Sequence, residues 1–136
     1  MIEAVINCLE LKLRPVLPAG VGLYGYPGPK AKQPVAVIHK FINGQADYFL
    51  GNVERSVDIV VEVAVESVSE NITPVQEMAD LMHRTIMSIR SFSTEYGIIA
   101  DVFRMAPVNY PIDLNGKTVQ HLGGIYKFNV RPLPPE

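Results

Sequence analysis

The 136-residue sequence contains only one cysteine, Cys8, which excludes an internal disulfide framework. A chain of this kind fits a reducing compartment, or a particle assembled in one. Long apolar runs are also missing, because none approaches the roughly 20 residues of a membrane-spanning helix. Glu3 and Glu10 interrupt the apolar pattern at the N-terminus, and no basic-then-apolar signal region is visible there. We therefore expect no secretory signal and no membrane span.

Motifs for metal binding and catalysis are missing as well. His39, His83 and His121 have no second histidine, cysteine or carboxylate at the spacing of a known metal-binding motif. No serine lies in a G-x-S-x-G elbow, and Cys8 falls beside an apolar stripe, where we expect it to pack as a small apolar residue. The sequence therefore predicts a protein that is not an enzyme, with no catalytic residue, cofactor or metal ion.

Three glycines, Gly20, Gly22 and Gly25, match the spacing of a dinucleotide-binding fingerprint. That fingerprint needs a strand before it and a helix after it, so that backbone N–H groups point at the pyrophosphate. Here a proline-rich segment precedes the glycines, and Tyr26-Pro27-Gly28-Pro29 follows, where no helix can begin. We interpret the glycines as part of a flexible loop.

Two segments have the apolar period of amphipathic helices: residues 2–14, and a second segment that starts near Thr73. Pro15 ends the first because it disfavours helical geometry at the preceding residue. The second opens with Thr73-Pro74-Val75-Gln76, a capping box with proline at the first helical position, and is expected to end by Ser93. Its expected buried stripe consists of Val75, Met78, Ala79, Met82, Ile86 and Ile89.

The remaining segments have the patterns of strands and turns. The clearest is 57–66, where apolar positions alternate with more polar ones, as in a strand with one buried face. Asn43-Gly44 and Asn115-Gly116 are typical of hairpin turns, and Gly123-Gly124 predicts a bulge or sharp bend in the last strand. Further strands are expected at 35–42, 46–50, 98–105 and 118–131, with a proline-interrupted stretch at 107–113.

This order of elements predicts one α+β domain over residues 1–136: a mostly antiparallel twisted sheet with two amphipathic helices packed on one face. A Pro/Gly-rich loop at 15–34, which includes a possible short strand at 21–26, and an extended tail at 132–136 complete it. Because so long a connection is usually functional, we expect it to contact partners. The predicted subunit or partner contacts are Tyr24, Tyr26, Lys30, Lys32 and Arg131.

Acidic residues are concentrated in the middle of the chain, although the formal net charge is only −2. From Glu54 to Asp80 there are seven acids and one base, whereas the other residues hold seven acids and eleven bases. If the protein forms a ring with the polar face of strand 57–66 inward, its carboxylates line a channel that repels DNA phosphates. The alternatives are a solvated face, or pairing with Lys127, Arg131 or Arg104 on a neighbouring strand. The predicted channel-lining residues are Glu54, Asp58, Glu62 and Glu66.

The chain begins with MIEAVINCLELKLRPVL, an amphipathic helix that runs into a proline loop, and continues to the long strand SVDIVVEVAVES. After these come the capped helix TPVQEMADLMHRTIMSIRS and the closing strand GIYKFNVRP. In this order of elements the chain resembles the tail-terminator or tail-completion proteins of long-tailed bacteriophages. The resemblance covers most of the chain but includes no single diagnostic residue.

The resemblance implies a structural virion protein of the tail or neck, assembled in the host cytoplasm. Such proteins form a ring, typically of six copies, that caps the tail tube, stops its polymerisation and offers a head-joining surface. The implied partners are further copies of the chain, the tail tube protein, a head-completion or connector protein and, if the tail is contractile, a sheath protein. DNA is passing cargo only, and no membrane is involved. The alternatives are another neck component, or a small ligand-binding domain or enzyme whose site is assembled from distant residues.

Overall fold

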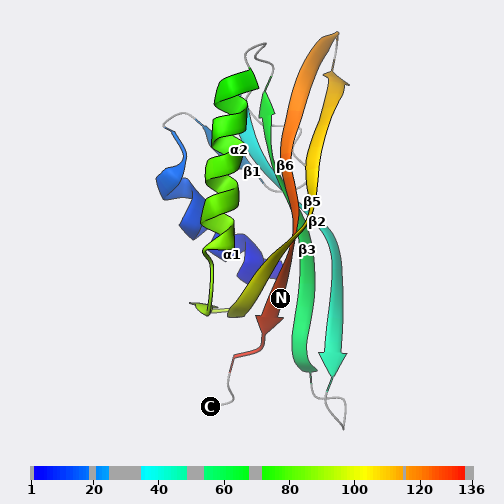
Figure 1. Cartoon of the computed structure of the whole chain (residues 1–136). Helices are drawn as coiled ribbons and strands as arrows, with labels where there is room; N and C mark the ends of the chain where they lie inside the picture. Colours follow the sequence, from blue (N-terminus) through cyan, green and yellow to red (C-terminus); the bar gives the residue numbers. More distant parts are fainter. Residues whose placement is uncertain are drawn as a thin grey trace.

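Figure 1 shows the protein as a computed structural model, which describes residues 2–18, 21–24, 35–48, 54–67, 72–114 and 116–133. The helices in these ranges are α1 (Ile2–Leu13) and α2 (Ile72–Met87), with a short 3-10 helix, η1 (Arg14–Val16), directly after α1. The strands are β1 (Gly22–Tyr24), β2 (Val35–Tyr48), β3 (Glu54–Ser67), β4 (Phe92–Thr94), β5 (Gly97–Leu114) and β6 (Lys117–Arg131).

These strands form one six-stranded sheet in the order β1-β2-β3-β6-β5-β4. β1 runs parallel to β2, and every other neighbouring pair is antiparallel. Both helices lie on the same side of the sheet, which twists strongly along its length (Figure 1). The predicted fold class, a mostly antiparallel sheet with two helices packed on one face, is confirmed.

The hydrophobic core lies between the two helices and the sheet. Alternate residues of β3, from Val57 to Val65, face it, and each is at most 8% exposed, as the period-two pattern predicts. Full burial of such a side chain contributes roughly 1.5–3 kcal/mol. The other strands and α1 add Ala4, Val5, Leu9, Leu13, Ile99, Tyr126, Phe128 and Val130.

α2 presents the predicted stripe to this core. Val75, Met82 and Ile86 are at most 2% exposed, and Ile89, which follows the helix, is 2% exposed. The predicted start was wrong, because α2 begins at Ile72 and Thr73 therefore lies inside the first turn and not at its cap. The helix ends at Met87, before Ser93, as expected. The backbone N–H of Ser88 donates to the carbonyls of both Arg84 and Thr85, which tightens the last turn, and β4 follows where the helix was expected to fade.

β2 corrects the first predicted hairpin. The strand runs without interruption from Val35 to Tyr48, and its antiparallel partner is β3 instead of residues 46–50. A tight Asn-Gly hairpin turn requires positive φ at both residues, and neither Asn43 nor Gly44 has it. Instead, Ile42 is an extra residue in the ladder, and Oδ1 of Asn43 accepts a hydrogen bond from the N–H of Gly44 at 2.8 Å.

β5 and β6 form the longest hairpin, and Gly116 has φ 78° in the predicted turn. β5 is continuous through Pro107 and Pro111, which the sequence indicated as an interruption. The prediction of a bulge at Gly123-Gly124 is also wrong, because β6 pairs with β3 there without a shift in register. The extra residues lie in β5 instead, at Ala100 and Met105.

Candidate functional site

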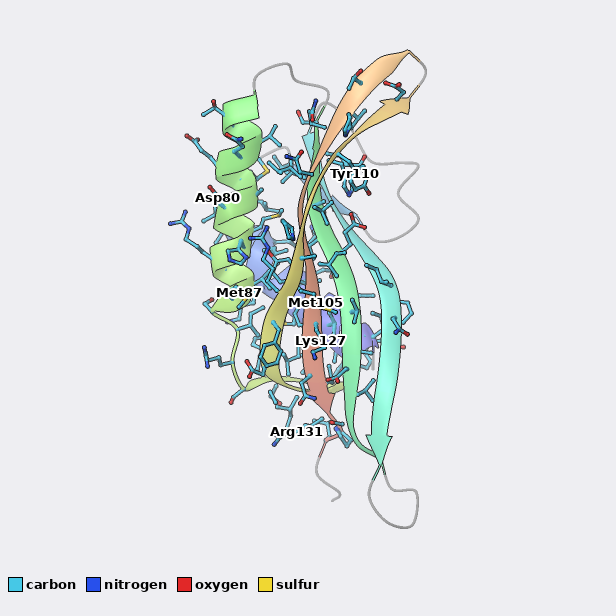
Figure 2. All side chains as sticks on the ribbon, turned by 45° about the vertical axis from the view of Figure 1, so that its right-hand side comes forward. Asp80, Met87, Met105, Tyr110, Lys127 and Arg131 are labelled. Atoms are coloured by element: carbon cyan, nitrogen blue, oxygen red, sulfur yellow. The ribbon has the colours of Figure 1, made fainter. Side chains whose placement is uncertain are left out.

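The face of the sheet opposite α1 and α2, which we call the helix-free face, carries the predicted acidic row. In an antiparallel sheet directly paired residues share a face, so Asp58 pairs beside Asn129, and Glu66 beside His121. β5 brings Phe103 and Tyr110 to the same face. Figure 2 shows the side chains on the ribbon, turned from the view of Figure 1.

His121 lies between two carboxylates of the acidic row. Its Nε2 atom is 2.6 Å from Oε1 of Glu62, and its Nδ1 atom is 3.2 Å from Oε1 of Glu66. Each ring nitrogen therefore lies within hydrogen-bonding distance of a carboxylate oxygen, and a ring nitrogen that carries a hydrogen donates to that oxygen. The histidine is 6% exposed and Glu62 is 8% exposed, so water screens the pair only weakly.

Tyr110 extends this network from β5. Its ring stacks on the imidazole of His121, with the ring centroids 4.6 Å apart, and its hydroxyl donates to Oε1 of Glu62 at 3.3 Å. Burial, and after it the negative charge of Glu62, raises the pKa of Tyr110, so the hydroxyl keeps its hydrogen and acts as the donor. Three strands, β3, β5 and β6, therefore meet in one polar cluster of Glu62, Glu66, Tyr110 and His121, which we call the histidine cluster.

Gly123 lets the strands approach closely beside the histidine cluster. A Cβ atom at this position would overlap the carbonyl oxygen of Val63 and would come within 2.6 Å of the Cα of Ala64. The predicted sharp feature at the Gly-Gly pair is thus a close backbone approach between β6 and β3, in which only glycine fits.

Three of the four predicted channel-lining residues, Asp58, Glu62 and Glu66, have partners within the described chain. Asp58 accepts a hydrogen bond from Nδ2 of Asn129 at 3.0 Å, and the side chain of Glu54 lies outside the described part of the structure. Glu62 contacts His121 and Tyr110, and Glu66 contacts His121. If this face lined a channel, the half-buried side chain of Asp58 would therefore be more accessible from the channel than the buried side chain of Glu62.

The predicted contact residues are only partly described. The backbone of Tyr24 ends β1, and Arg131 is exposed at the end of β6. Tyr26, Lys30 and Lys32 lie outside the described residues. Nothing in the sequence near His121 indicated its role, because the two carboxylates are more than fifty positions away and only the β3–β6 register brings them together.

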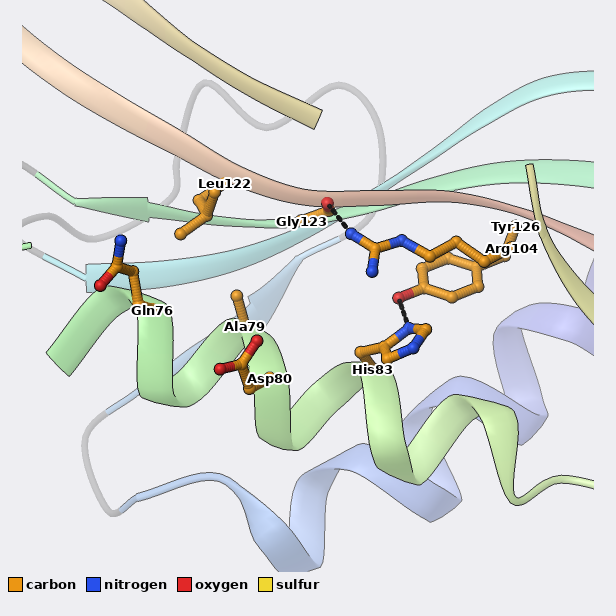
Figure 3. Close-up of a pocket in the computed structure, with 8 residues that line it drawn as sticks. All are labelled: Gln76, Ala79, Asp80, His83, Arg104, Leu122, Gly123 and Tyr126. Carbon is orange, nitrogen blue, oxygen red and sulfur yellow. Dashed lines mark hydrogen bonds between the residues drawn. The ribbon is translucent and has the colours of Figure 1, made fainter. Parts of the chain in front are cut away.

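A polar cleft of about 270 Å³ lies on the other side of the sheet, between α2 and the β5–β6 pair (Figure 3). Arg104 reaches into it from β5 and donates from Nη2 to the carbonyl of Gly123 at 3.1 Å. Gln76, Ala79, Asp80 and His83 line the helix side, and Leu122, Gly123 and Tyr126 line the sheet side.

His83 and Tyr126 join the two walls of this cleft. Nδ1 of His83 lies 2.9 Å from the hydroxyl of Tyr126. Burial and then the positive charge of Arg104 lower the pKa of His83, with Asp80 acting in the opposite direction. Burial also raises the pKa of Tyr126. The pair is therefore neutral near pH 7, and it fits a structural hydrogen bond between helix and sheet better than a proton-transfer site.

No family model matches the chain, and no curated protein matches it in sequence. Within the described residues, no group of three or more histidine, cysteine, aspartate or glutamate side chains is placed to hold a metal ion. No helix among them has the length and apolar character that crossing a membrane requires.

Proposed function

We propose that this protein is a structural, ring-forming subunit that acts as the tail terminator of a long-tailed bacteriophage. The ring caps the tail tube, stops its polymerisation and offers the surface to which the head is joined. The order of elements that carries the resemblance supports this proposal, since a helix, long strands, a second helix and a closing hairpin follow one another in the fold.

The observation that carries the proposal is the helix-free face. Among the described elements, both helices pack on the opposite side, and the helix-free face includes Phe103 and Tyr110, which are 50% and 44% exposed. A sheet with one face covered by helices and one left open fits a ring wall in which the helices lie outside and the open face lies toward the pore.

The charges of the helix-free face agree with DNA as passing cargo. Among the side chains that the structure describes, this face has four carboxylates, Asp58, Glu62, Glu66 and Asp101, and two basic groups, His121 and Lys127. Binding to DNA depends on cations that neutralise phosphates, so a wall with an excess of carboxylates holds the passing duplex weakly.

The test is the mass of the purified full chain in solution by light scattering, alone and with tail tubes, together with negative-stain images. We expect rings, either free or at tube ends. Monomers alone under both conditions, with tube ends left bare, contradict the proposal. Another neck position is distinguished by a pull-down, because a terminator retains the tube protein whereas a head-completion or connector component retains portal or adaptor protein.

The cleft beside Arg104 favours ligand binding as a second candidate function, because it gathers a guanidinium, an imidazole, an amide and a carboxylate. Thermal-shift measurements with small carboxylic acids test it. A rise in melting temperature that disappears in an Arg104→Gln variant supports binding in the cleft, and no rise with any acid argues against it.

A further inference from the structure

Two opposite charges face the cleft between α2 and the β5–β6 pair. Figure 3 shows the guanidinium of Arg104, which comes from the sheet, and the carboxylate of Asp80, which comes from α2, both pointing into the space between helix and sheet. The two groups form no ion pair with each other, since no such pair within 4.0 Å joins these two described residues. Both charges are therefore open to a third molecule.

The backbone of β6 fixes the guanidinium at one end of the cleft. Nη2 of Arg104 donates to the carbonyl of Gly123. A Cβ atom added at Gly124 would lie only 3.0 Å from Nε of Arg104, so the missing side chain makes room for the arginine to lie across the strand. A guanidinium has several N–H groups in a planar fork, and the one bond to Gly123 leaves others for a carboxylate.

The carboxylate of Asp80 is the only anion among the residues that line the cleft, and Arg104 is the only cation. Within the described part of the chain, no hydrogen bond occupies the carboxylate of Asp80. His83 does not compete for it as a cation, because burial and then the charge of Arg104 lower the pKa of its ring. The lining therefore offers one charge of each sign.

A ligand with a single charge satisfies only one of these groups. A plain carboxylate at Arg104 is repelled by Asp80, and a plain amine at Asp80 is repelled by Arg104. A molecule with both a carboxylate and an ammonium group is attracted by both residues. Ala79 and Leu122, which are apolar members of the lining, offer a surface for the short carbon chain between the two charges.

The size of the cleft limits the length of that molecule. Its volume of about 270 Å³ is below the range of about 300–1,000 Å³ that is typical of pockets for drug-sized ligands. From these observations we infer that the cleft binds a small amino acid, with the carboxylate on Arg104 and the ammonium group on Asp80. This assignment rests on the ligand-binding function proposed for the cleft and is independent of the proposed ring.

The test is a titration of the full chain, followed by NMR, with matched sets of small molecules. The amino acids are alanine, β-alanine and γ-aminobutyric acid, which separate the two charges by increasing lengths of chain. Propionic and butyric acid lack the amine, and propylamine and butylamine lack the carboxylate. We expect at least one amino acid to bind roughly five-fold more tightly than the acid and the amine of its length, which is the upper end for an exposed ion pair.

Two variants test the role of each charge. Asp80→Asn should remove the preference for the amino acid, while the plain acid binds at least as tightly as before. Arg104→Gln should abolish the binding of both. The matched controls are Glu77→Gln and Arg90→Gln, which remove the same charges from exposed positions outside the cleft lining. Both controls should bind like the wild type.

The outcomes distinguish the ligand from the site. If the plain acids or the amines bind as tightly as every amino acid, or if Asp80→Asn retains the preference, the assignment of an amino acid is overturned, although the cleft still binds ligands. If no acid, amine or amino acid binds, the ligand-binding function of the cleft is overturned together with the assignment. Neither result affects the proposed ring, which the mass in solution tests separately.

Discussion

The Nε2 atom of His121 lies 2.6 Å from Oε1 of Glu62, although the two residues are 59 positions apart and belong to different strands. The same ring reaches Glu66 with its other nitrogen. A single imidazole thus fixes β3 against β6 on the face of the sheet that has no helix. Buried ion pairs of this kind contribute little net stability over an apolar core, but breaking one partner leaves an uncompensated charge.

His121→Ala should therefore destabilise the fold by about 3 kcal/mol, because it leaves the buried carboxylate of Glu62 without its partner at 2.6 Å. Urea unfolding followed by circular dichroism measures this loss. The double variant His121→Ala with Glu62→Gln, which removes the orphaned charge, should recover part of it. A single variant as stable as the wild type, or a double variant whose loss equals the sum of the two single losses, would show that the contact is not energetically coupled.

Gly123→Ala tests the close approach between β6 and β3. The added Cβ would overlap the carbonyl oxygen of Val63, a backbone atom that cannot turn away, so we expect a loss of about 3 kcal/mol in the free energy of unfolding. Gly116→Ala is the matched control: its φ of 78° strains an alanine by about 1 kcal/mol, but no atom lies within 4 Å of the new methyl group. Equal losses at the two positions would contradict the steric argument.

The sequence predicted the parts of the fold that depend on local periodicity. The alternation along β3 and the stripe of α2 identified buried faces correctly, because burial on one side of an element imposes its period on the residues. The prediction of a hairpin turn at Asn43-Gly44 was wrong because a local turn preference is weaker than the hydrogen bonds of a long ladder. β2 pairs with β3 over its whole length. The prediction of an interruption at Pro107 and Pro111 was wrong because an edge strand tolerates proline, whereas an inner strand does not.

The candidate site could not be predicted, because it depends on the register between neighbouring strands, and a local sequence pattern does not contain that register. The acidic row was placed on the correct side of β3, opposite Val61 and Val63, but its partners come from β5 and β6. Predicting the histidine cluster would have required the pairing of Glu66 with His121, and a shift of one residue would have turned His121 to the other face. The bulges at Ile42 and Met105 have no sequence signal that we can identify.

The thiol of Cys8 should be almost unreactive in the folded protein. Burial raises its pKa to about 12 from an ordinary value of 9.0, and Lys12 offsets the shift only in part. Ellman's reagent at pH 8 should label the urea-unfolded chain quickly and the native chain hardly at all, because the thiolate is the reactive form. Rapid labelling without urea would mean that the thiol of Cys8 is not buried between α1 and the rest of the core.

The same shift gives a pH dependence of stability with a defined sign. A thiol that keeps its proton when folded and loses it when unfolded makes the unfolded state more favourable as pH rises. The free energy of unfolding should therefore decrease above about pH 9, the ordinary value, and Cys8→Ala should remove that part of the decrease.

The titration of His83 distinguishes the two charges that face it in the cleft. Burial is the largest cause of its lowered pKa, Arg104 lowers the pKa further, and Asp80 raises it. Arg104→Gln should therefore raise the pKa of His83, and Asp80→Asn should lower it, as measured by NMR titration of the ring protons. Because the folded-state pKa lies below that of the unfolded chain, the associated stability is present above about pH 6.5 and is lost as pH falls. The two substitutions change net charge in opposite directions, so shifts of the same sign would indicate a general loosening of α2 and not a local electrostatic effect.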